Sequence, residues 1–258
     1  MAIAVPTTPV EPAGRRTVRP VDAAGLVLLR HGAQGPEVLL GRRHRRAGFL
    51  PDIYVFPGGR VDPRDELPSG FNEDLNPNVV RQLGGAGSRR PDASFPRAAL
   101  RETFEEAGLL LAAPNEGPAP PPSPEPHWQA YRTHGVRPAF ARMDFVCRAI
   151  TPTYSKRRYN TRFFLADGSC VQGALTGDGE LEDLAWRPIT ALDALHIVDV
   201  TQFVLAEALR RWRQRRPVGA ETARLFCYRE RAARWRIGTT GEWRPAPETP
   251  LKSAIYQG

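Results

Sequence analysis

Three glutamates on one predicted helix constrain this chain more than any other feature. The helix lies in the stretch from Pro96 to Leu111, PRAALRETFEEAGLLL, and we expect it to end at Gly108. One face is apolar, and a second face carries Glu102, Glu105 and Glu106 at i, i+3 and i+4. Like charges at this spacing cost about 0.2–0.5 kcal/mol per pair, a repulsion that a hard divalent cation would remove. We therefore predict that the three glutamates bind Mg²⁺ or Mn²⁺, with a solvated acidic face as the alternative.

A tight turn precedes this helix in the sequence. Ile53 to Phe56 reads as a short strand, and Pro57, Gly58 and Gly59 follow it. Two adjacent glycines allow the backbone to pass close to a ligand. We predict that Phe56, Gly58 and Gly59 contact substrate.

Together the turn and the helix resemble the Nudix box, whose pattern is Gly-x5-Glu-x7-Arg-Glu-U-x-Glu-Glu-x-Gly-U with U aliphatic. The matching residues are Gly59, Arg101, Glu102, Glu105, Glu106, Gly108 and Leu109. Three features depart from the pattern: Thr103 occupies an aliphatic position, Asp65 or Glu66 replaces the first Glu, and the segment 66–100 replaces the usual seven residues. A box interrupted in this way resembles the Nudix branch that includes the peroxisomal coenzyme A diphosphatases and their bacterial relatives. The stretches 157–164 and 178–189 also resemble that branch.

This resemblance implies an α/β fold, a Nudix-like α/β/α sandwich around a mixed β-sheet. It also implies an enzyme, a Nudix-type diphosphatase that hydrolyses a diphosphate linkage in a nucleoside diphosphate derivative with Mg²⁺. Coenzyme A or an acyl-coenzyme A is the first candidate substrate, and ADP-ribose or another nucleotide sugar is the alternative.

Roles for individual residues follow from the matching positions. The metal ligands would be Glu102, Glu105 and Glu106, with Arg101 orienting one carboxylate by a charge-assisted hydrogen bond. The general base stays open between Glu106 and Glu180, with Glu182 as a third choice. Substrate contacts are expected from Arg42 and Arg46, in the basic stretch before the turn, and from Arg162, for which packing is an equal alternative.

Composition narrows the class of partner. The net charge of +8, carried almost entirely by arginine, favours an anionic partner, and a small nucleotide diphosphate fits this requirement. The arginines also leave an RNA-binding protein open as an alternative, although we identify no interleaved aromatic and basic motif that would support it. Thr103 and Asp65 keep open a catalytically weak nucleotide-sensing regulator. The absence of a run of about 18 apolar residues argues against a membrane span. The scattered cysteines favour a reducing, cytoplasmic setting. A homodimer stays open.

A single domain is expected over residues 20–245, between a disordered arm at 1–19 and a tail at 246–258. Its predicted strands are Ala23–Arg30 and Glu37–Gly41, which together read as a β-hairpin, and then Asp144–Ile150, Tyr159–Leu165 and Leu184–Trp186. Its further helices are Asn76–Leu83, one from about Ala191, and Val198–Arg213. We expect the insertion 67–95 to be a replaceable lid or specificity element. The Pro-rich segment 112–126 should be extended.

Overall fold

The computed structural model of this chain describes residues 18–118, 120, 122–176 and 179–248. Within these residues a mixed sheet runs in the order β10-β2-β1-β8-β7-β11-β12-β13, with β3 beside β2 and β4 beside β1. Its strands are β1 (Val21–Gly32), β2 (Gly35–Arg43), β3 (Tyr54–Val55), β4 (Gly58–Arg60), β7 (Asp144–Ile150), β8 (Tyr159–Asp167), β10 (Leu181–Pro188), β11 (Arg224–Arg229), β12 (Ala232–Ile237) and β13 (Arg244–Pro245).

The centre of this sheet follows from the apolar runs in the sequence. β1 is buried from Ala23 to Leu29, as expected for a strand covered on both faces, and it pairs in parallel with β8. β2 turns back antiparallel to β1, which confirms the predicted hairpin. The strands predicted at Asp144–Ile150, Tyr159–Leu165 and Leu184–Trp186 are also confirmed, the last two as parts of longer strands.

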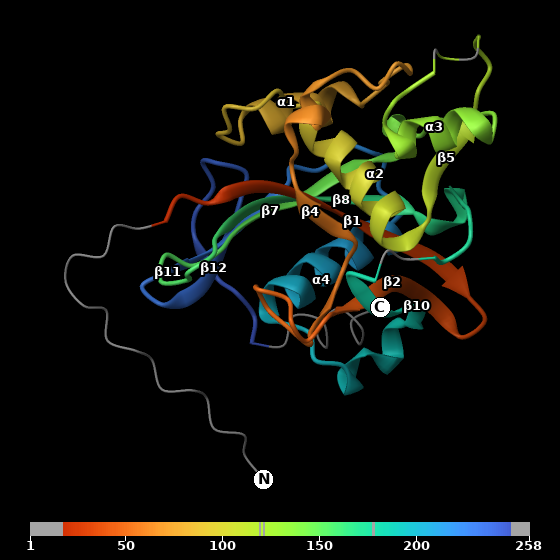
Figure 1. Cartoon of the computed structure of the whole chain (residues 1–258). Helices are drawn as coiled ribbons and strands as arrows, with labels where there is room; N and C mark the ends of the chain where they lie inside the picture. The colour runs from red at the N-terminus through yellow and green to blue at the C-terminus, as the bar shows by residue number, and fades with distance from the viewer. Residues whose placement is uncertain (1–17, 119, 121, 177–178, 249–258) are drawn as a thin grey trace.

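Helices cover both faces of the sheet, so the predicted α/β/α sandwich is confirmed (Figure 1). The helix α2 (Ser94–Ala107) packs on one face, where Leu26, Phe95 and Leu100 belong to a common apolar cluster. The helix α4 (Asp199–Arg213) packs on the other face, against a second cluster that includes Val27 and Leu165. None of the helices in the described ranges is long and apolar enough to cross a membrane.

The predicted end of the glutamate helix is confirmed. Gly108 adopts a left-handed conformation with φ 69°, and its N–H donates to the carbonyl of Phe104. The chain then leaves as strand β5 (Leu110–Pro114), which pairs with β6 (Val136–Pro138) and β9 (Val171–Gln172) in a small second sheet. The Pro-rich segment therefore begins as a strand, and the helix α3 (Pro126–Thr133) starts at its end.

The insertion is built into the core rather than attached to it. Its helix α1 (Pro77–Gly84) confirms the predicted helix and buries Val79 and Leu83 completely or nearly so. Ala86 accepts a hydrogen bond from the buried Arg162, and Ser88 donates one to Asp22. A short linker would remove these contacts, so the structure argues against our expectation that the segment is replaceable without loss of folding.

Two features near the C-terminus depart from the sequence prediction. The helix expected from about Ala191 is a 3-10 helix at Ile189–Ala194, whereas α4 confirms the helix predicted at Val198–Arg213. Strands β11, β12 and β13 were not predicted. Residues 1–17 and 249–258, which include most of the proposed arm and tail, lie outside the described residues.

Candidate active site

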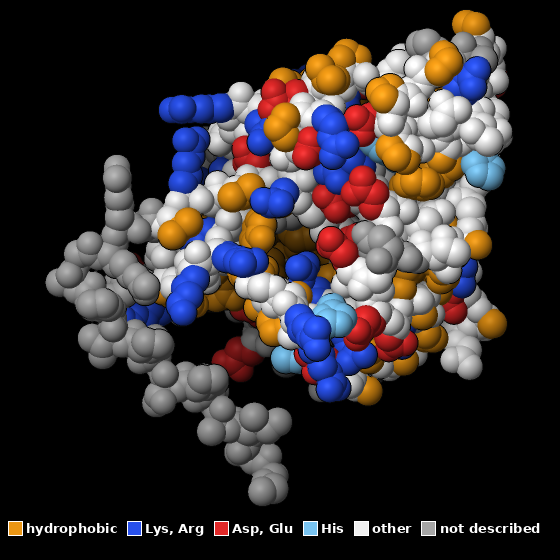
Figure 2. All heavy atoms as spheres, viewed as in Figure 1, with side chains coloured by type: hydrophobic (Ala, Val, Ile, Leu, Met, Phe, Trp, Pro, Cys, Tyr) orange, Lys and Arg blue, Asp and Glu red, His pale blue; other side chains and the backbone are white. Residues whose placement is uncertain are grey.

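The glutamate helix and the glycine turn meet at the edge of a cleft of about 850 Å³. Figure 2 shows it as a hollow with an apolar floor and charged side chains on its rim. Strands β1, β4, β7, β8 and β11, the turn before β4 and the N-terminus of α4 all contribute to its lining. The cleft therefore collects side chains from segments that are far apart in the sequence.

The two turn glycines bring the backbone against the glutamates of α2. Gly58 N–H donates to Oε2 of the buried Glu106 at 2.7 Å. A Cβ on Gly59 would lie 2.4–2.5 Å from the Glu102 carboxylate, and one on Gly58 would lie 2.6 Å from the Ala24 carbonyl oxygen. Any larger residue would push the turn away from the helix. Glycine is thus required here for contact between backbone and carboxylates.

Arg101 organises the remaining carboxylates. Its side chain is only 6% exposed, and it forms a bidentate pair with Asp65 at 2.9 and 3.0 Å. The same guanidinium donates to Glu102 at 2.9 Å and to Glu105 at 2.8 Å. One arginine therefore anchors two glutamates of α2 to the 3-10 helix at Pro63–Glu66.

Burial of several carboxylates in one place changes their protonation. Burial raises the pKa of Glu102 to about 7, and the charge of Glu105 adds to this against the opposing effect of Arg101. Burial also raises the pKa of Glu106 well above its ordinary value, and the charges of Glu102 and Glu180 contribute, although the Gly58 N–H opposes the shift. Such groups are stabilised in their charged form by a nearby cation.

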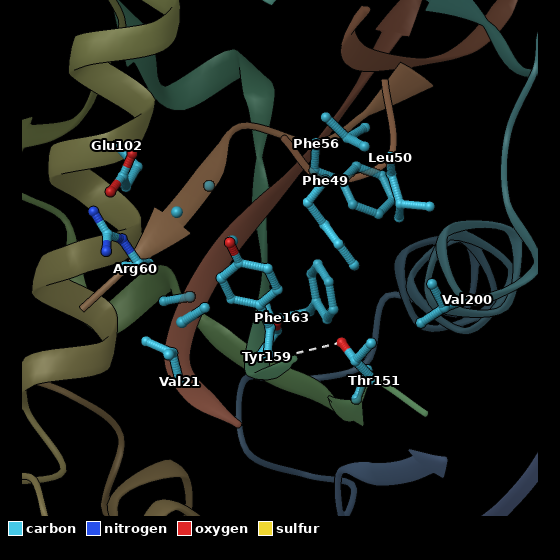
Figure 3. Close-up of a pocket in the computed structure, with 18 of the residues that line it drawn as sticks. Val21, Phe49, Leu50, Phe56, Arg60, Glu102, Thr151, Tyr159, Phe163 and Val200 are labelled. Carbon is cyan, nitrogen blue, oxygen red and sulfur yellow. Dashed lines mark hydrogen bonds between the residues drawn. The ribbon is translucent and has the colours of Figure 1, made fainter. Parts of the chain in front are cut away.

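The other half of the cleft is aromatic. In Figure 3, Glu102 and Arg60 lie on one side, and Phe49, Tyr159, Phe163 and Val200 lie on the other. The rings of Phe49 and Tyr159 meet edge to face at 5.0 Å, and those of Phe56 and Phe163 at 6.0 Å. The aromatic half can bury an aromatic or aliphatic group, while the half that contains Glu102 and Arg60 can bind phosphates.

Comparisons with known proteins agree with this geometry. No family model matches the chain. It is 36% identical over 137 residues to the acyl-coenzyme A diphosphatase NUDT19 of Gallus gallus, covering 39% of this chain and 36% of that protein. The human protein of the same name is 31% identical over 117 residues, covering 36% of this chain and 31% of that protein. The match thus spans about a third of the length of these relatives.

A solved structure extends the comparison over most of the fold. The NUDIX hydrolase from Alicyclobacillus acidocaldarius is 28% identical with a TM-score of 0.51, covering 72% of this chain and 90% of that one. The chain is therefore similar to Nudix hydrolases in both sequence and fold. The fold brings together the two halves of the interrupted motif that resembles a Nudix box.

The structure also identifies which acid takes the place of the first Glu of the Nudix box. Asp65 is 3% exposed and faces Arg101, and its second oxygen accepts the Asp62 N–H at 2.7 Å. Glu66 instead points to Arg90 of the insertion and is more exposed.

Thr103, the other departure from the Nudix pattern, is fully buried and donates to the carbonyl of Ala99 at 2.7 Å. The hydroxyl is therefore satisfied within the helix.

Several predicted site residues do line the cleft. They are Phe56, Gly58, Gly59, Arg101, Glu102, Glu105, Glu106 and Glu180. Glu180 lies close enough to Glu106 to influence its pKa. Glu182, the third choice for a base, pairs with Arg42 at 2.9 Å and is not among the lining residues.

The predicted arginines lie elsewhere. Arg42 is paired with Asp52 and Glu182, and neither it nor Arg46 is among the lining residues. Arg162 is fully buried, bound to Asp22 at 2.8 Å and stacked on Phe95 at 3.8 Å, so its role is packing. Neighbouring arginines that the prediction missed line the cleft instead: Arg43, Arg60 and Arg90. Strand alternation distinguishes Arg43 from Arg42, but only after the strand and its buried face are known.

The oxygen-rich donor set suits a hard cation such as Mg²⁺ or Mn²⁺. Within the described residues no three Asp, Glu, His or Cys side chains converge on one point. Glu102 and Glu105 are held by Arg101, and Glu106 by the Gly58 N–H. Because Mg²⁺ usually keeps waters and binds substrate phosphates, one or two of these carboxylates suffice on the protein side. The residues present therefore fit such an ion.

Proposed function

We propose that this chain hydrolyses a diphosphate linkage in a nucleoside diphosphate derivative, with coenzyme A or an acyl-coenzyme A as the first candidate. The observation that carries this proposal is the position of three α2 glutamates, anchored by Arg101 and the Gly58 N–H, beside a cleft with cationic and aromatic sections. The acyl-coenzyme A diphosphatase name of the matched relatives supports the same substrate class. ADP-ribose or another nucleotide sugar is the alternative.

We assign metal binding to the set Glu102, Glu105 and Glu106, of which one or two would bind the ion directly. A divalent cation held there would neutralise phosphate charge and lower the pKa of the attacking water. Glu106 is buried and the Glu102 side chain is only 13% exposed, so their raised pKa values make a cation favourable at this place. Arg101 holds the carboxylates of Glu102 and Glu105 beside each other, because it binds both and is itself held by Asp65.

The reaction adds water to phosphorus, breaks the bridging P–O bond and transfers one proton from the water to a carboxylate. Glu106 and Glu180 are the two carboxylates we assign as candidate bases, because both line the cleft and interact electrostatically. Arg43 and Arg60 line the same section and would stabilise charge on the phosphate oxygens. The aromatic section would bury the group carried beyond the diphosphate.

Substitution of the glutamates tests this assignment. Glu105→Gln and Glu106→Gln should each lower Mg²⁺-dependent hydrolysis by at least about a hundredfold, since each removes a charge that stabilises the reacting centre. Glu116→Gln is the matched control, because Glu116 is an exposed glutamate outside the cleft lining. The assay is product formation from coenzyme A, an acyl-coenzyme A and ADP-ribose with Mg²⁺ or Mn²⁺. Wild-type turnover by Glu106→Gln would refute the assignment, and ligand binding without product would identify a regulator.

A further inference from the structure

The C-terminal strands expose a sheet face that the proposed catalytic function does not use. Figure 1 shows β11 and β12 at the side of the molecule away from α2 and α3. Phe226 and Trp235 are paired across these strands and pack against Phe203 of α4. Because side chains alternate along a strand, Arg234 and Arg236 point to the opposite face, away from α4.

Four arginines and one tryptophan gather on that opposite face, which we term the cationic face: Arg148, Arg229, Arg234, Arg236 and Trp243. The guanidinium groups of Arg229 and Arg236 lie 4.9 and 4.5 Å from the Trp243 ring centre. Cys227, paired with Arg234, lies among them. Burial raises the pKa of this thiol, and Arg229, Arg236 and Arg148 all act to lower it. Several arginines therefore surround a single side chain.

Arg148 of the cationic face donates to Asn160 at 2.7 Å and interacts with Asp22, but the other three arginines lack the acidic partners that arginines have elsewhere in the molecule. Arg210, Arg211 and Arg224 share Glu207 and Glu221 on the neighbouring part of the fold. In the part of the chain that the structure describes, no carboxylate forms an ion pair with Arg229, Arg234 or Arg236. Like charges held together without partners repel, so the cationic face would gain stability from a bound anion.

We propose that the cationic face binds single-stranded nucleic acid. Arg234 and Arg236 emerge on one face about 6.6 Å apart, as alternate residues of a strand, and can contact successive phosphates of an extended backbone. Trp243 and the guanidinium planes beside it offer surfaces on which unpaired bases stack. Interleaved aromatic and basic residues are therefore present in the segment 224–245, RLFCYRERAARWRIGTTGEWRP, contrary to our expectation from the sequence.

A lipid surface or a polyanion without bases fits the observations less well. Either partner would bind the arginines, but a tryptophan in contact with two of them would add little to its affinity. A single strand uses both parts, since phosphates bind arginine and bases stack on the aromatic ring. The effect of removing the aromatic ring on binding affinity therefore distinguishes a single strand from a lipid surface or a polyanion without bases.

The test measures binding of the full chain to a labelled single-stranded RNA of about twelve nucleotides by fluorescence anisotropy. For four phosphate contacts, the logarithm of the association constant should fall with the logarithm of salt concentration with a slope of about −3. Arg234→Gln with Arg236→Gln should reduce that slope by about 1.4 and weaken binding at least tenfold at low salt. The matched control is Arg132→Gln with Arg215→Gln, which removes the same charge from exposed positions elsewhere.

A second variant examines stacking. Trp243→Leu should weaken RNA binding by at least about fivefold but leave binding of a heparin oligosaccharide, which has charge and no bases, within about twofold. Hydrolysis in the cleft should be unchanged in all these variants, because the cationic face lies on the other side of the sheet from Phe226 and Tyr228, which line the cleft. Circular dichroism establishes that each variant is folded.

Three outcomes would overturn the proposal. One is the absence of RNA binding at about 50 mM salt. Another is an equal loss of affinity in the Arg132 and Arg215 control, which would indicate a response to net charge alone. The third is evidence of a partner recognised without its bases, namely an equal loss of RNA and heparin binding in Trp243→Leu or tighter binding to anionic vesicles than to RNA.

Discussion

At the scale of single residues, the site depends on charges that are buried and shared. Arg101 bonds to Asp65, Glu102 and Glu105 at once, and nearly all of its surface is covered. A buried charge whose partner is removed costs far more than the pair contributes, because the remaining charge is left without water. The box is therefore a stability element as well as a proposed catalytic one.

The neighbours Asp65 and Glu66 provide a direct comparison of buried and exposed pairing. Asp65→Asn should destabilise the fold by about 3 kcal/mol, because it leaves Arg101 buried without its bidentate partner. Glu66→Gln, which weakens only the partly exposed pair with Arg90, should cost less than about 1 kcal/mol. Urea unfolding measures both. A larger cost for Glu66→Gln would mean that the wrong acid has been assigned to the box.

At the scale of elements, contacts at both ends of α2 hold its glutamates in position at the cleft. Its start connects through Arg97 to Glu73 of the insertion, at 2.6 Å, and its end turns at Gly108 into β5. The insertion also places Arg90 at the cleft. It therefore contributes to the core and to the site at once.

The turn at Gly108 should tolerate no side chain. A Cβ there would lie 2.3 Å from Thr176 Oγ1 and 2.7 Å from the Ala174 carbonyl oxygen, at a φ of 69°. Gly108→Ala should cost more than about 2 kcal/mol, since the clash adds to a left-handed strain of about 1–2 kcal/mol. Gly135→Ala is the matched control, with φ 65° and open space around it, so it should show the strain alone. Equal losses in urea unfolding would contradict the role of the contact.

Arg90 should influence the choice of substrate. If it binds a phosphate beyond the diphosphate, Arg90→Gln should raise KM about tenfold for coenzyme A and less than about twofold for 3′-dephospho-coenzyme A. Arg89→Gln is the control, because Arg89 is adjacent, exposed and outside the cleft lining. Steady-state kinetics with both substrates provide the measurement. The same change in KM for both substrates would show that Arg90 does not recognise the additional phosphate.

At the scale of the whole molecule, two apolar clusters lie on the two faces of one sheet, and a few polar groups are enclosed with them. His127 is one of these: it is 2% exposed and its ring packs at a tilt against Trp128. Neither of its ring nitrogens has a hydrogen-bond partner in the described residues. Burial, with smaller effects from Arg101 and Arg64, lowers its pKa to about 3. Folding therefore favours the neutral ring.

His127 should make the fold sensitive to acid. The unfolded ring, with a pKa near 6.5, binds a proton before the folded one does, so stability falls as the pH drops from about 6.5 towards 3. At pH 5 the loss should be about 2 kcal/mol relative to pH 7.5, and His127→Phe should remove it. Urea unfolding at both pH values is the measurement, with the exposed His134→Gln as control. An unchanged pH response in His127→Phe would contradict this account.

Local sequence patterns by themselves determined the helix with its three glutamates, its end at Gly108, the hairpin and the central strands. These features depend on side-chain period and on glycine conformation, which act over a few residues. Packing decided the rest: that Asp65 rather than Glu66 meets Arg101, that Arg43 lines the cleft while Arg42 and Arg162 do not, and that the insertion is core. The aromatic section of the cleft and the cationic face also arise only when distant strands pair. Which face of a strand is buried, and which segments meet across a sheet, depends on long-range contacts that no local pattern contains.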